Sequence, residues 1–364
     1  MPYFQESKGL KEKPRFVIID SNETFEKNRA FLEKMRKSSK FEIFHVNEKI
    51  ARKFLEKTPF GFVFSGKYGG NRNLGLVFSA VLQEDIVFFD DDTRPVSNCL
   101  QKFEEYFDAG HLLIQGKYVG DTGGTIRLLF ELIKTLEKMQ KNQMTQNQLK
   151  TKLTKIFAGI SESALETGEL FLGGNLGISK HVSKQYCFFP TDYRLEDALF
   201  CRFLPYFCKQ ARLPEITEPP TVVHKNRLRP IFTLSSNLKN ELEGTQIGIS
   251  IERALTNENH NPLPLQAKLR ALYPLEFIFE KLKKEKLDHY VYDLGEESII
   301  VELNKIEAMV KKPPILAKAE LNKQTQLFLE CQTIWPTAIA ELAKVEIVKS
   351  IAKTRADPRL SIKN

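Results

Sequence analysis

The stretch IVFFDDD, residues 86–92, joins four apolar residues to three adjacent aspartates. A short apolar run of this kind is typical of a buried strand. In open α/β sheets ligands bind at the carboxyl ends of the strands, so Asp90, Asp91 and Asp92 would lie at a ligand-binding edge. Carboxylates gathered there repel one another unless a divalent cation such as Mg²⁺ or Mn²⁺ binds them. The alternative is an ordinary turn in which an aspartate caps the next element.

Apolar runs and helical patterns alternate on both sides of this stretch. We expect strands at 16–19, 41–46, 60–64, 86–89, 112–115, the end of 171–179 and 221–223. We expect helices at 23–35, 48–56, 126–139 and 195–210, and a further helix that opens from the glycine-rich loop 66–73 and ends at Leu82. This alternation is typical of βαβ units, so the sequence predicts an α/β fold with a mostly parallel sheet.

The pattern changes near residue 233. Segments 265–287 and 323–351 favour helix, although Pro274 and Pro336 should break or bend them. We therefore predict a sheet-containing domain at 14–232 and a mainly helical C-terminal region at 233–364.

Composition indicates a folded, cytoplasmic protein. Of the 364 residues 42% are hydrophobic, which is enough for a sizeable core. The five cysteines form no CxxC pair, and their odd number argues against a disulfide framework, so a reducing compartment is expected. No apolar run approaches the roughly 20 residues that a membrane-spanning helix needs.

The positive charge lies mainly in the first part of the chain. Residues 1–232 hold 35 Lys and Arg against 28 Asp and Glu, and the remainder holds 19 against 18. There is no arginine stripe with interleaved aromatic residues, so nucleic acid is not the expected partner. The excess suits a nucleoside diphosphate, peripheral contact with an anionic membrane surface, or simply a solvated surface rich in lysine.

Other motifs accompany the acidic triplet in a characteristic order. Gly-Gly-Asn-Arg-Asn stands at 69–73, Gly-Gly-Asn at 173–175 and Leu-Glu-Asp at 195–197, and a short strand ends at His224. This succession resembles the GT-A glycosyltransferases of the family 2 type over about residues 14–230. The resemblance implies a Rossmann-like GT-A domain that takes a UDP- or GDP-linked sugar as donor and transfers it to an acceptor hydroxyl. It leaves the acceptor unidentified.

The resemblance also implies a metal site at the DXD motif. Asp92 would bind the cation, Asp90 would be shared between the metal's waters and the donor ribose, and His224 would complete the site. Imidazole suits Mn²⁺ better than Mg²⁺, so Mn²⁺ is the preferred ion. The cation would stabilise the charge on the departing diphosphate.

The donor-binding residues implied by the resemblance are Asp20, Asn22, Arg72, Asp90, Asp91, Gly173, Gly174 and Asn175. Arg72 begins a helix behind a glycine loop, where backbone N–H groups already favour an anion. The family's Pro-x-Tyr-Asn is here Ile19-Asp20-Ser21-Asn22, so only the asparagine of that motif is kept. Asp20 could instead accept a hydrogen bond from a uracil or guanine N–H.

Glu196 and Asp197 match the family's Glu-Asp motif at the start of a helix. An inverting transfer needs a base for the acceptor hydroxyl, and Asp197 is the candidate. Acidic residues in the first turn of a helix are also favoured by the helix dipole alone.

Two other functions fit parts of the sequence. A phosphatase like the haloacid dehalogenases also carries Asp-x-Asp after an apolar strand, but its threonine stands two residues after the second aspartate. Here Thr93 follows Asp92 at once, and the triplet lies deep in the chain. A non-catalytic binding or scaffold protein, with the helical region recruiting a partner, is the second alternative.

Overall fold

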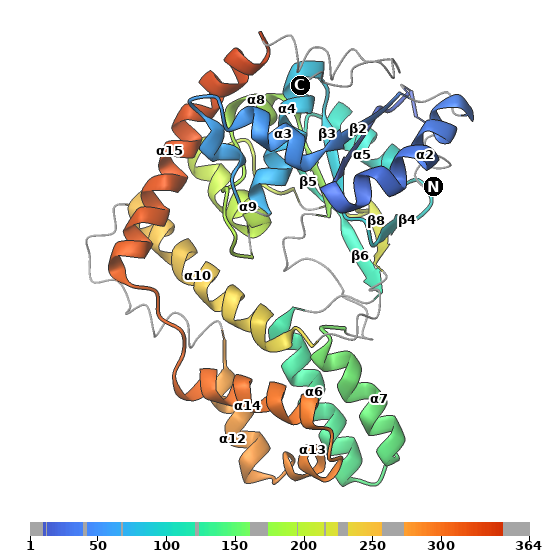
Figure 1. The fold of residues 1–364 in the computed structure, drawn as a ribbon, viewed down its shortest axis with the longest axis vertical. Helices are drawn as coiled ribbons and strands as arrows, with labels where there is room; N and C mark the ends of the chain where they lie inside the picture. The colour runs from blue at the N-terminus through green and yellow to red at the C-terminus, as the bar shows by residue number, and fades with distance from the viewer. Residues whose placement is uncertain are drawn as a thin grey trace.

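The computed structural model describes residues 10–11, 13–38, 42–66, 68–120, 124–160, 174–194, 196–214, 216–224, 232–256 and 273–344. Figure 1 shows two lobes, one in which helices surround small sheets and one made of helices alone. We call them the α/β lobe and the helical lobe. The α/β class predicted from the sequence is confirmed. None of the described helices is both long and apolar enough to cross a membrane.

The chain enters the α/β lobe through a βαβ unit. Strands β1 (Phe16–Asp20) and β2 (Ile43–Asn47) pair in parallel, and α2 (Asn22–Ser38) connects them. Helix α3 (Glu48–Leu55) follows, and the side chain of Asn47 caps it by accepting a hydrogen bond from the Ile50 N–H. These two strands and two helices lie where the sequence predicts them.

The strand predicted at 60–64 is wrong. Residues Gly61–Phe64 form a short 3₁₀-helix, η2, although Val63 and Phe64 are buried as expected. A Cβ atom at Gly61 would lie 2.6 Å from the Glu56 Cα atom, so the backbone folds back tightly on the end of α3. The apolar run therefore predicted the burial of this segment correctly, but the tight turn after α3 gives the segment a 3₁₀ conformation instead of an extended one.

Two three-stranded sheets make up the rest of the β-structure in the described part of the chain. One has the order β3 (Ile86–Phe89), β7 (Asn175–Ile178), β5 (Leu113–Gln115). The other has the order β4 (Thr93–Pro95), β8 (Thr221–His224), β6 (Lys117–Gly120).

Three of the five described strand pairings are antiparallel, namely β3 with β7, β5 with β7 and β4 with β8. The expectation of a mostly parallel sheet is therefore wrong. The cause is the insertion of β7 between β3 and β5 in the opposite direction. Such an arrangement depends on contacts between distant segments, which local periodicity does not report.

Helices cover the sheets of the α/β lobe. They are α4 (Gly69–Leu82), α5 (Cys99–Asp108), α8 (Lys180–Gln185) and α9 (Glu196–Phe207).

The helical lobe is built from both halves of the chain. It contains α6 (Thr125–Gln140), α7 (Gln146–Phe157), α12 (Leu275–Lys284), α13 (His289–Asp293), α14 (Glu297–Lys311) and the first part of α10 (Leu234–Thr256). Apolar side chains from these helices, mostly leucine and isoleucine, share one core. Helix α12 begins directly after Pro274, where the sequence predicts a break.

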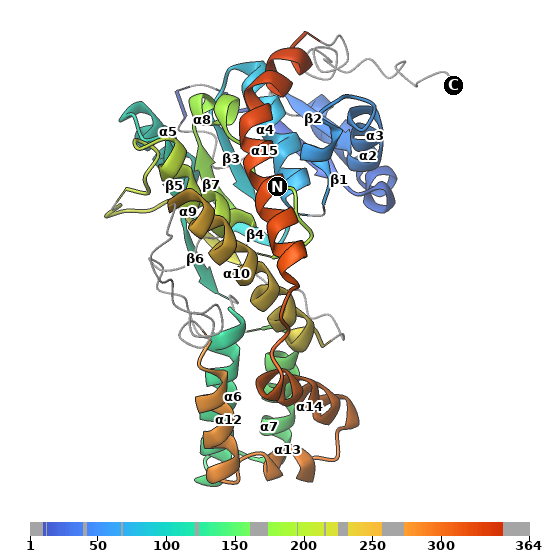
Figure 2. The same cartoon turned by 90° about the vertical axis from the view of Figure 1, so that its left-hand side faces the viewer.

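The last helix, α15 (Lys318–Leu342), returns to the α/β lobe and lies along α8 and α4 (Figure 2). Trp335 is fully buried, packs 5.9 Å from the ring of Phe64 and donates a hydrogen bond to the Ser183 carbonyl at 2.8 Å. Gln332 hydrogen-bonds the N–H and C=O of Cys187. The two lobes are thus interleaved in the chain, and the domain boundary near 233 stays a prediction.

We expect Trp335→Ala to lower the free energy of unfolding by about 3–5 kcal/mol, because it opens a cavity beneath α15 and leaves the Ser183 carbonyl unpaired. Urea unfolding measures the difference. Phe277→Ala is the matched control, since this ring is 59% exposed, and it should cost less than about 1 kcal/mol. Similar losses in the two variants would contradict the structural role of Trp335.

Candidate functional site

The three aspartates form the turn between β3 and β4. The Thr93 N–H and hydroxyl donate to the Asp90 carbonyl at 3.1 Å and 2.7 Å, which closes the turn. Asp91 is exposed, whereas Asp90 and Asp92 are half-buried. The triplet therefore lies at the carboxyl end of β3, as the sequence predicts.

Asp90 is the point at which several distant segments meet. Its Oδ1 atom lies 3.7 Å from Nη2 of Arg72. On its other side it faces Gly174, where an added Cβ atom would lie 2.0 Å from Asp90 Oδ2 and 2.3 Å from the Tyr118 hydroxyl. A side chain at residue 174 would displace both groups, so this approach requires glycine.

Close packing at the start of α4 fixes the position of Arg72. A Cβ atom at Gly69 would lie 1.7 Å from the Phe189 carbonyl oxygen, and one at Gly70 would lie 2.3 Å from that of Ser65. The two glycines let this end of the helix pack directly against neighbouring backbone. One turn into the helix, buried Asn73 accepts a hydrogen bond from the Phe188 N–H at 2.7 Å.

The Arg72 guanidinium is buried between two carboxylates and two aromatic rings. Its Nε atom lies 3.1 Å from Glu196 Oε1, and its Cζ atom lies 5.8 Å and 5.7 Å from the ring centres of Phe88 and Phe188. Burial alone would lower the pKa of Arg72, but the charges of Glu196 and Asp90 outweigh it and raise the pKa. The guanidinium therefore stays charged and joins α4, the Asp90 turn and α9.

Glu196 and Asp197 are the first two residues of α9, and their surroundings differ. The Glu196 side chain is only 6% exposed. Burial and the nearby charge of Asp197 raise the pKa of Glu196 to about 7, although Arg72 opposes the shift. Asp197 is partly buried, and its Oδ1 accepts a hydrogen bond from the Ala198 N–H at 2.7 Å. Of the two, Asp197 is the more accessible carboxylate.

Tyr118 lies in the same site and was not expected from the sequence. Burial and the charge of Asp90 raise its pKa, so its hydroxyl keeps its proton at neutral pH and can donate a hydrogen bond. Phe88 and Phe188, which flank Arg72, were also not expected. Each of the three has the pattern of an ordinary apolar core residue, so nothing in the sequence distinguished them.

His224 is placed by the register of β8. Its backbone pairs with Thr93 of β4 on one side and with Gly120 of β6 on the other. The residue therefore stands beside the one that follows Asp92, but its side chain lies outside the described residues. Within the described part of the chain, no group of three or more His, Cys, Asp and Glu side chains is gathered as metal ligands. The metal role of Asp90, Asp92 and His224 stays a prediction.

Asp20 makes its contacts on the β1–β2 sheet. Its Oδ2 atom lies 2.8 Å from His45 Nε2 and 2.9 Å from Asn28 Nδ2. A hollow of about 690 Å³ lies beside the end of β1 and is lined by Ser21, by Glu23 of α2, and by residues of α3 with Glu56 directly after it. Asn22 opens α2, and its side chain lies outside the description. Base recognition by Asp20 and Asn22 stays a prediction.

The Gly-Gly-Asn motif is described in part, because Gly173 lies outside the described residues. Gly174 faces Asp90, as given above. The buried Asn175 amide donates to the backbone carbonyls of Lys117 and Pro220 at 3.1 Å and 2.9 Å. It therefore ties β7 to β6 and to the segment before β8, and donor binding by Asn175 stays a prediction.

Comparisons with family models, with curated proteins and with solved structures found no match for this chain. Its function is therefore inferred from the residues and their geometry.

We expect Glu196→Gln to remove a pH dependence from the stability of the protein. The pKa of Glu196 rises from an ordinary 4.5 to about 7 on folding, so the folded protein holds this proton more tightly than the unfolded chain. That contribution is fully present below pH 4.5 and is lost as the pH rises through 7. Between pH 4.5 and pH 7, the wild type should therefore lose up to about 3 kcal/mol of unfolding free energy relative to the variant.

Urea unfolding at several pH values between those limits measures this slope. Glu105→Gln, which changes an exposed carboxylate of α5, should keep the slope of the wild type. A Glu196→Gln variant with an unchanged slope would show that this carboxylate is already ionised in the folded protein at acidic pH.

Proposed function

We propose that this protein is a metal-dependent glycosyltransferase of the GT-A type, in the hexosyltransferase class. It would move a sugar from a UDP- or GDP-linked donor to an acceptor hydroxyl. The observation that carries the proposal is the meeting at Asp90 of Arg72 and Gly174. These residues come from three separate motifs of the sequence, and a shared site accounts for their convergence. They meet at the carboxyl end of β3, and open α/β sheets bind ligands at the carboxyl ends of their strands.

The donor atoms at this edge suit a hard or borderline divalent cation. Asp90 and Asp92 supply carboxylate oxygens, and the register of β8 brings the backbone of His224 beside Thr93. These three residues would hold Mn²⁺ or Mg²⁺, with Mn²⁺ preferred if the imidazole binds. When bound, the cation would neutralise the charge that develops on the departing diphosphate.

Arg72 would act as a positioning residue. It holds Asp90 and Glu196 at 3.7 Å and 3.1 Å from the same guanidinium, so the metal-binding turn and the start of α9 keep a constant separation. Its aromatic neighbours restrict its movement. Arg72 keeps its positive charge, and the resemblance implies that this residue contacts the donor diphosphate.

Asp197 would be the catalytic base. It is partly exposed, whereas Glu196 beside it is buried and paired with Arg72. Asp197 would take the proton of the acceptor hydroxyl while the hydroxyl oxygen attacks the sugar carbon from the face opposite the diphosphate, which inverts that centre.

The first test is nucleotide binding. We expect UDP or GDP together with Mn²⁺ to raise the thermal unfolding temperature by several degrees, since a ligand that binds only the folded state stabilises it. A chelator should remove the effect, and Asp92→Ala should abolish it while the variant stays folded. Asp293→Ala, which changes an exposed side chain at the end of α13, is the control and should respond like the wild type. No stabilisation by either nucleotide with Mn²⁺ would favour a non-catalytic protein.

The second test concerns the base. Asp197→Asn should slow the hydrolysis of the accepted nucleotide sugar at least about 100-fold, because general-base catalysis is lost. Its stabilisation by nucleotide and Mn²⁺ should be retained, which separates catalysis from binding. Asp192→Asn, an exposed change shortly before α9, should keep the wild-type rate. Turnover by Asp197→Asn at the wild-type rate would rule out Asp197 as the base.

A further inference from the structure

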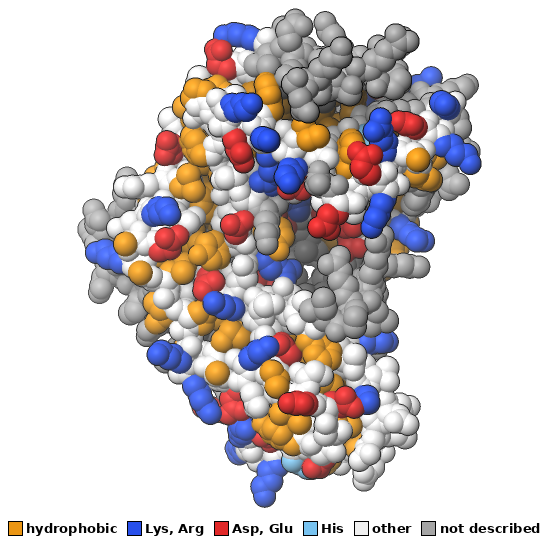
Figure 3. Space-filling model, in the orientation of Figure 1, with side chains coloured by type: hydrophobic (Ala, Val, Ile, Leu, Met, Phe, Trp, Pro, Cys, Tyr) orange, Lys and Arg blue, Asp and Glu red, His pale blue; other side chains and the backbone are white. Residues whose placement is uncertain are grey.

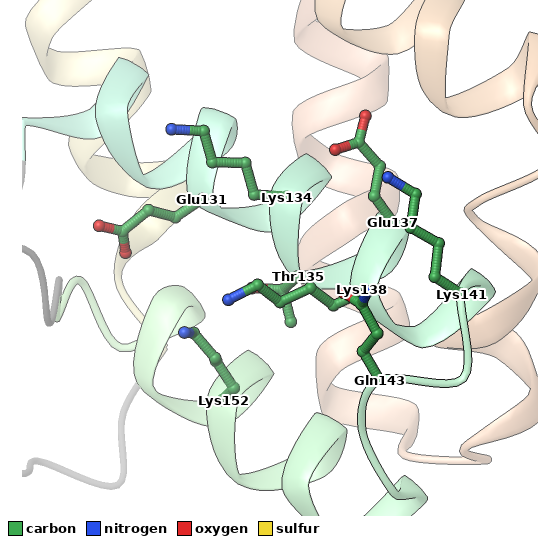
Figure 4. A pocket seen from close by; sticks show the side chains of 8 residues that line it. All are labelled: Glu131, Lys134, Thr135, Glu137, Lys138, Lys141, Gln143 and Lys152. Atoms are coloured by element: carbon green, nitrogen blue, oxygen red, sulfur yellow. The ribbon is translucent and has the colours of Figure 1, made fainter.

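Glu241 of α10 is a buried carboxylate that the proposed site does not use. At the surface, charges of both signs are mixed: on the face shown in Figure 3, basic and acidic side chains lie intermixed over both lobes. Beside α6 and α7, Lys134 and Lys141 extend away from the space that Lys138 and Lys152 share (Figure 4). These lysines do not converge on one position, whereas the contacts of Glu241 join two separate segments.

The first of these segments is the start of α6, which Glu241 caps from outside that helix. The N–H and the hydroxyl of Thr125, the first residue of α6, both donate hydrogen bonds to the Glu241 carboxylate. Gly124 stands at the cap position of α6 and has no side chain that could accept them. A carboxylate at this end of a helix also interacts favourably with the helix dipole. Helix α10 therefore supplies the acceptor that the sequence of α6 lacks.

The second segment is the one that leads into α9. The Oε1 atom of Glu241 lies 3.7 Å from Nη1 of Arg194, which stands two residues before Glu196 and three before Asp197. Burial raises the pKa of Glu241, and the charge of Arg194 and the hydrogen bonds from Thr125 oppose this shift. The two segments thus compensate a charge that would be costly to bury alone.

Neighbouring positions of α10 hold the backbone of the same segment. The side-chain oxygen of Asn240 accepts a hydrogen bond from the Arg194 N–H. A Cβ atom at Gly244 would lie 2.6 Å from the Arg194 carbonyl oxygen, and one at Gly248 would lie 2.9 Å from Cδ2 of Leu199. Helix α10 therefore lies directly against the segment before α9 and against the beginning of α9 (Figure 2).

Both partners of this buried carboxylate are close in sequence to groups of the candidate site. Thr125 follows β6, the strand of Tyr118, and Arg194 precedes Asp197, the base of the proposed reaction. The Tyr118 hydroxyl reaches the site, since it would lie 2.3 Å from a Cβ atom at Gly174. One carboxylate therefore contacts the chain after β6 and the chain before α9, and a shift of either segment would disturb the other.

We propose that Glu241 is a positioning residue, which joins the start of α6 to the segment before α9 and thereby fixes Asp197 relative to Tyr118. It acts through these two segments rather than on the substrate. Its role in catalysis rests on the proposed function, because Asp197 would take the acceptor proton. The structural coupling between α6 and α9 does not rest on that function, and it can be measured without any ligand.

Hydrogen–deuterium exchange of the full chain without ligand tests the coupling. Glu241→Gln keeps the shape of the side chain but removes its charge, so it should speed exchange at least about threefold in both α6 and α9. Thr125→Val, which changes only the α6 end of the contact, should speed exchange in α9 as well. Faster exchange in α6 alone would overturn the coupling.

The matched control is Glu302→Gln in α14. Glu302 is 5% exposed, against 9% for Glu241, and accepts a hydrogen bond from the Ser235 N–H at 3.2 Å. This change should loosen the start of α10 and leave exchange in α9 within about twofold of the wild type. Equal acceleration of α9 in both variants would overturn the proposal, because it would reduce the effect to a general loss of stability.

Turnover of the accepted nucleotide sugar tests the positioning of Asp197. Glu241→Gln should lower kcat at least about tenfold with little change in KM, because a base displaced by about 1 Å loses much of its effect. Glu241→Asp, which keeps the charge, should recover part of the loss, and Glu302→Gln should retain the wild-type rate. A normal kcat for Glu241→Gln with faster exchange in α9 would overturn the positioning role. A wild type without turnover would overturn the proposed function and the catalytic role with it, and the exchange measurements would still decide the coupling.

Discussion

The buried charge of Arg72 is the interaction on which the arrangement of the candidate site depends. A guanidinium removed from water is costly unless carboxylates and further contacts compensate it. Here Glu196 and Asp90 provide the opposite charge, and Phe88 and Phe188 provide ring faces against which the guanidinium packs. These groups come from three segments, namely β3 with the turn after it, the stretch before α9 and the start of α9, so the contacts of Arg72 specify how those segments are placed. Loss of one carboxylate would leave a buried charge, which is more damaging than the loss of a surface ion pair.

Close backbone contacts also position the segments that form the site. Among the described residues the sheets have two or three strands each, so they supply few ladder hydrogen bonds with which to align the site. Gly69 and Gly174 let main chain and side chains approach where any other residue would collide. The amides of Asn73 and Asn175 bind backbone carbonyls of neighbouring segments. Steric fit and buried amide hydrogen bonds therefore align segments that a larger sheet would align through its ladder hydrogen bonds.

The α/β lobe and the helical lobe are joined through α10. In the α/β lobe, the Arg72 guanidinium is buried and paired with carboxylates, which suits a site that must hold its groups still. Helix α10 contributes to the cores of both lobes. Near the start of α10, the Ser235 N–H donates a hydrogen bond to buried Glu302 of α14. The helical lobe is therefore packed against the rest of the molecule through α10.

The sequence by itself determined the strands at 16–19 and 86–89, the helices around them and the position of the three aspartates at a strand end. These features follow from apolar periodicity and from the order of neighbouring residues, which act over a few positions. Tertiary structure decided the direction of β7, the 3₁₀-helix at Gly61–Phe64 and the joining of α6 and α7 to helices from the end of the chain. It also decided the contents of the site, since Arg72 and Glu196 are 124 positions apart and Tyr118 looks like any core residue. Burial can be predicted from a local pattern, but the partner of a buried charge cannot, because it depends on how distant segments pack.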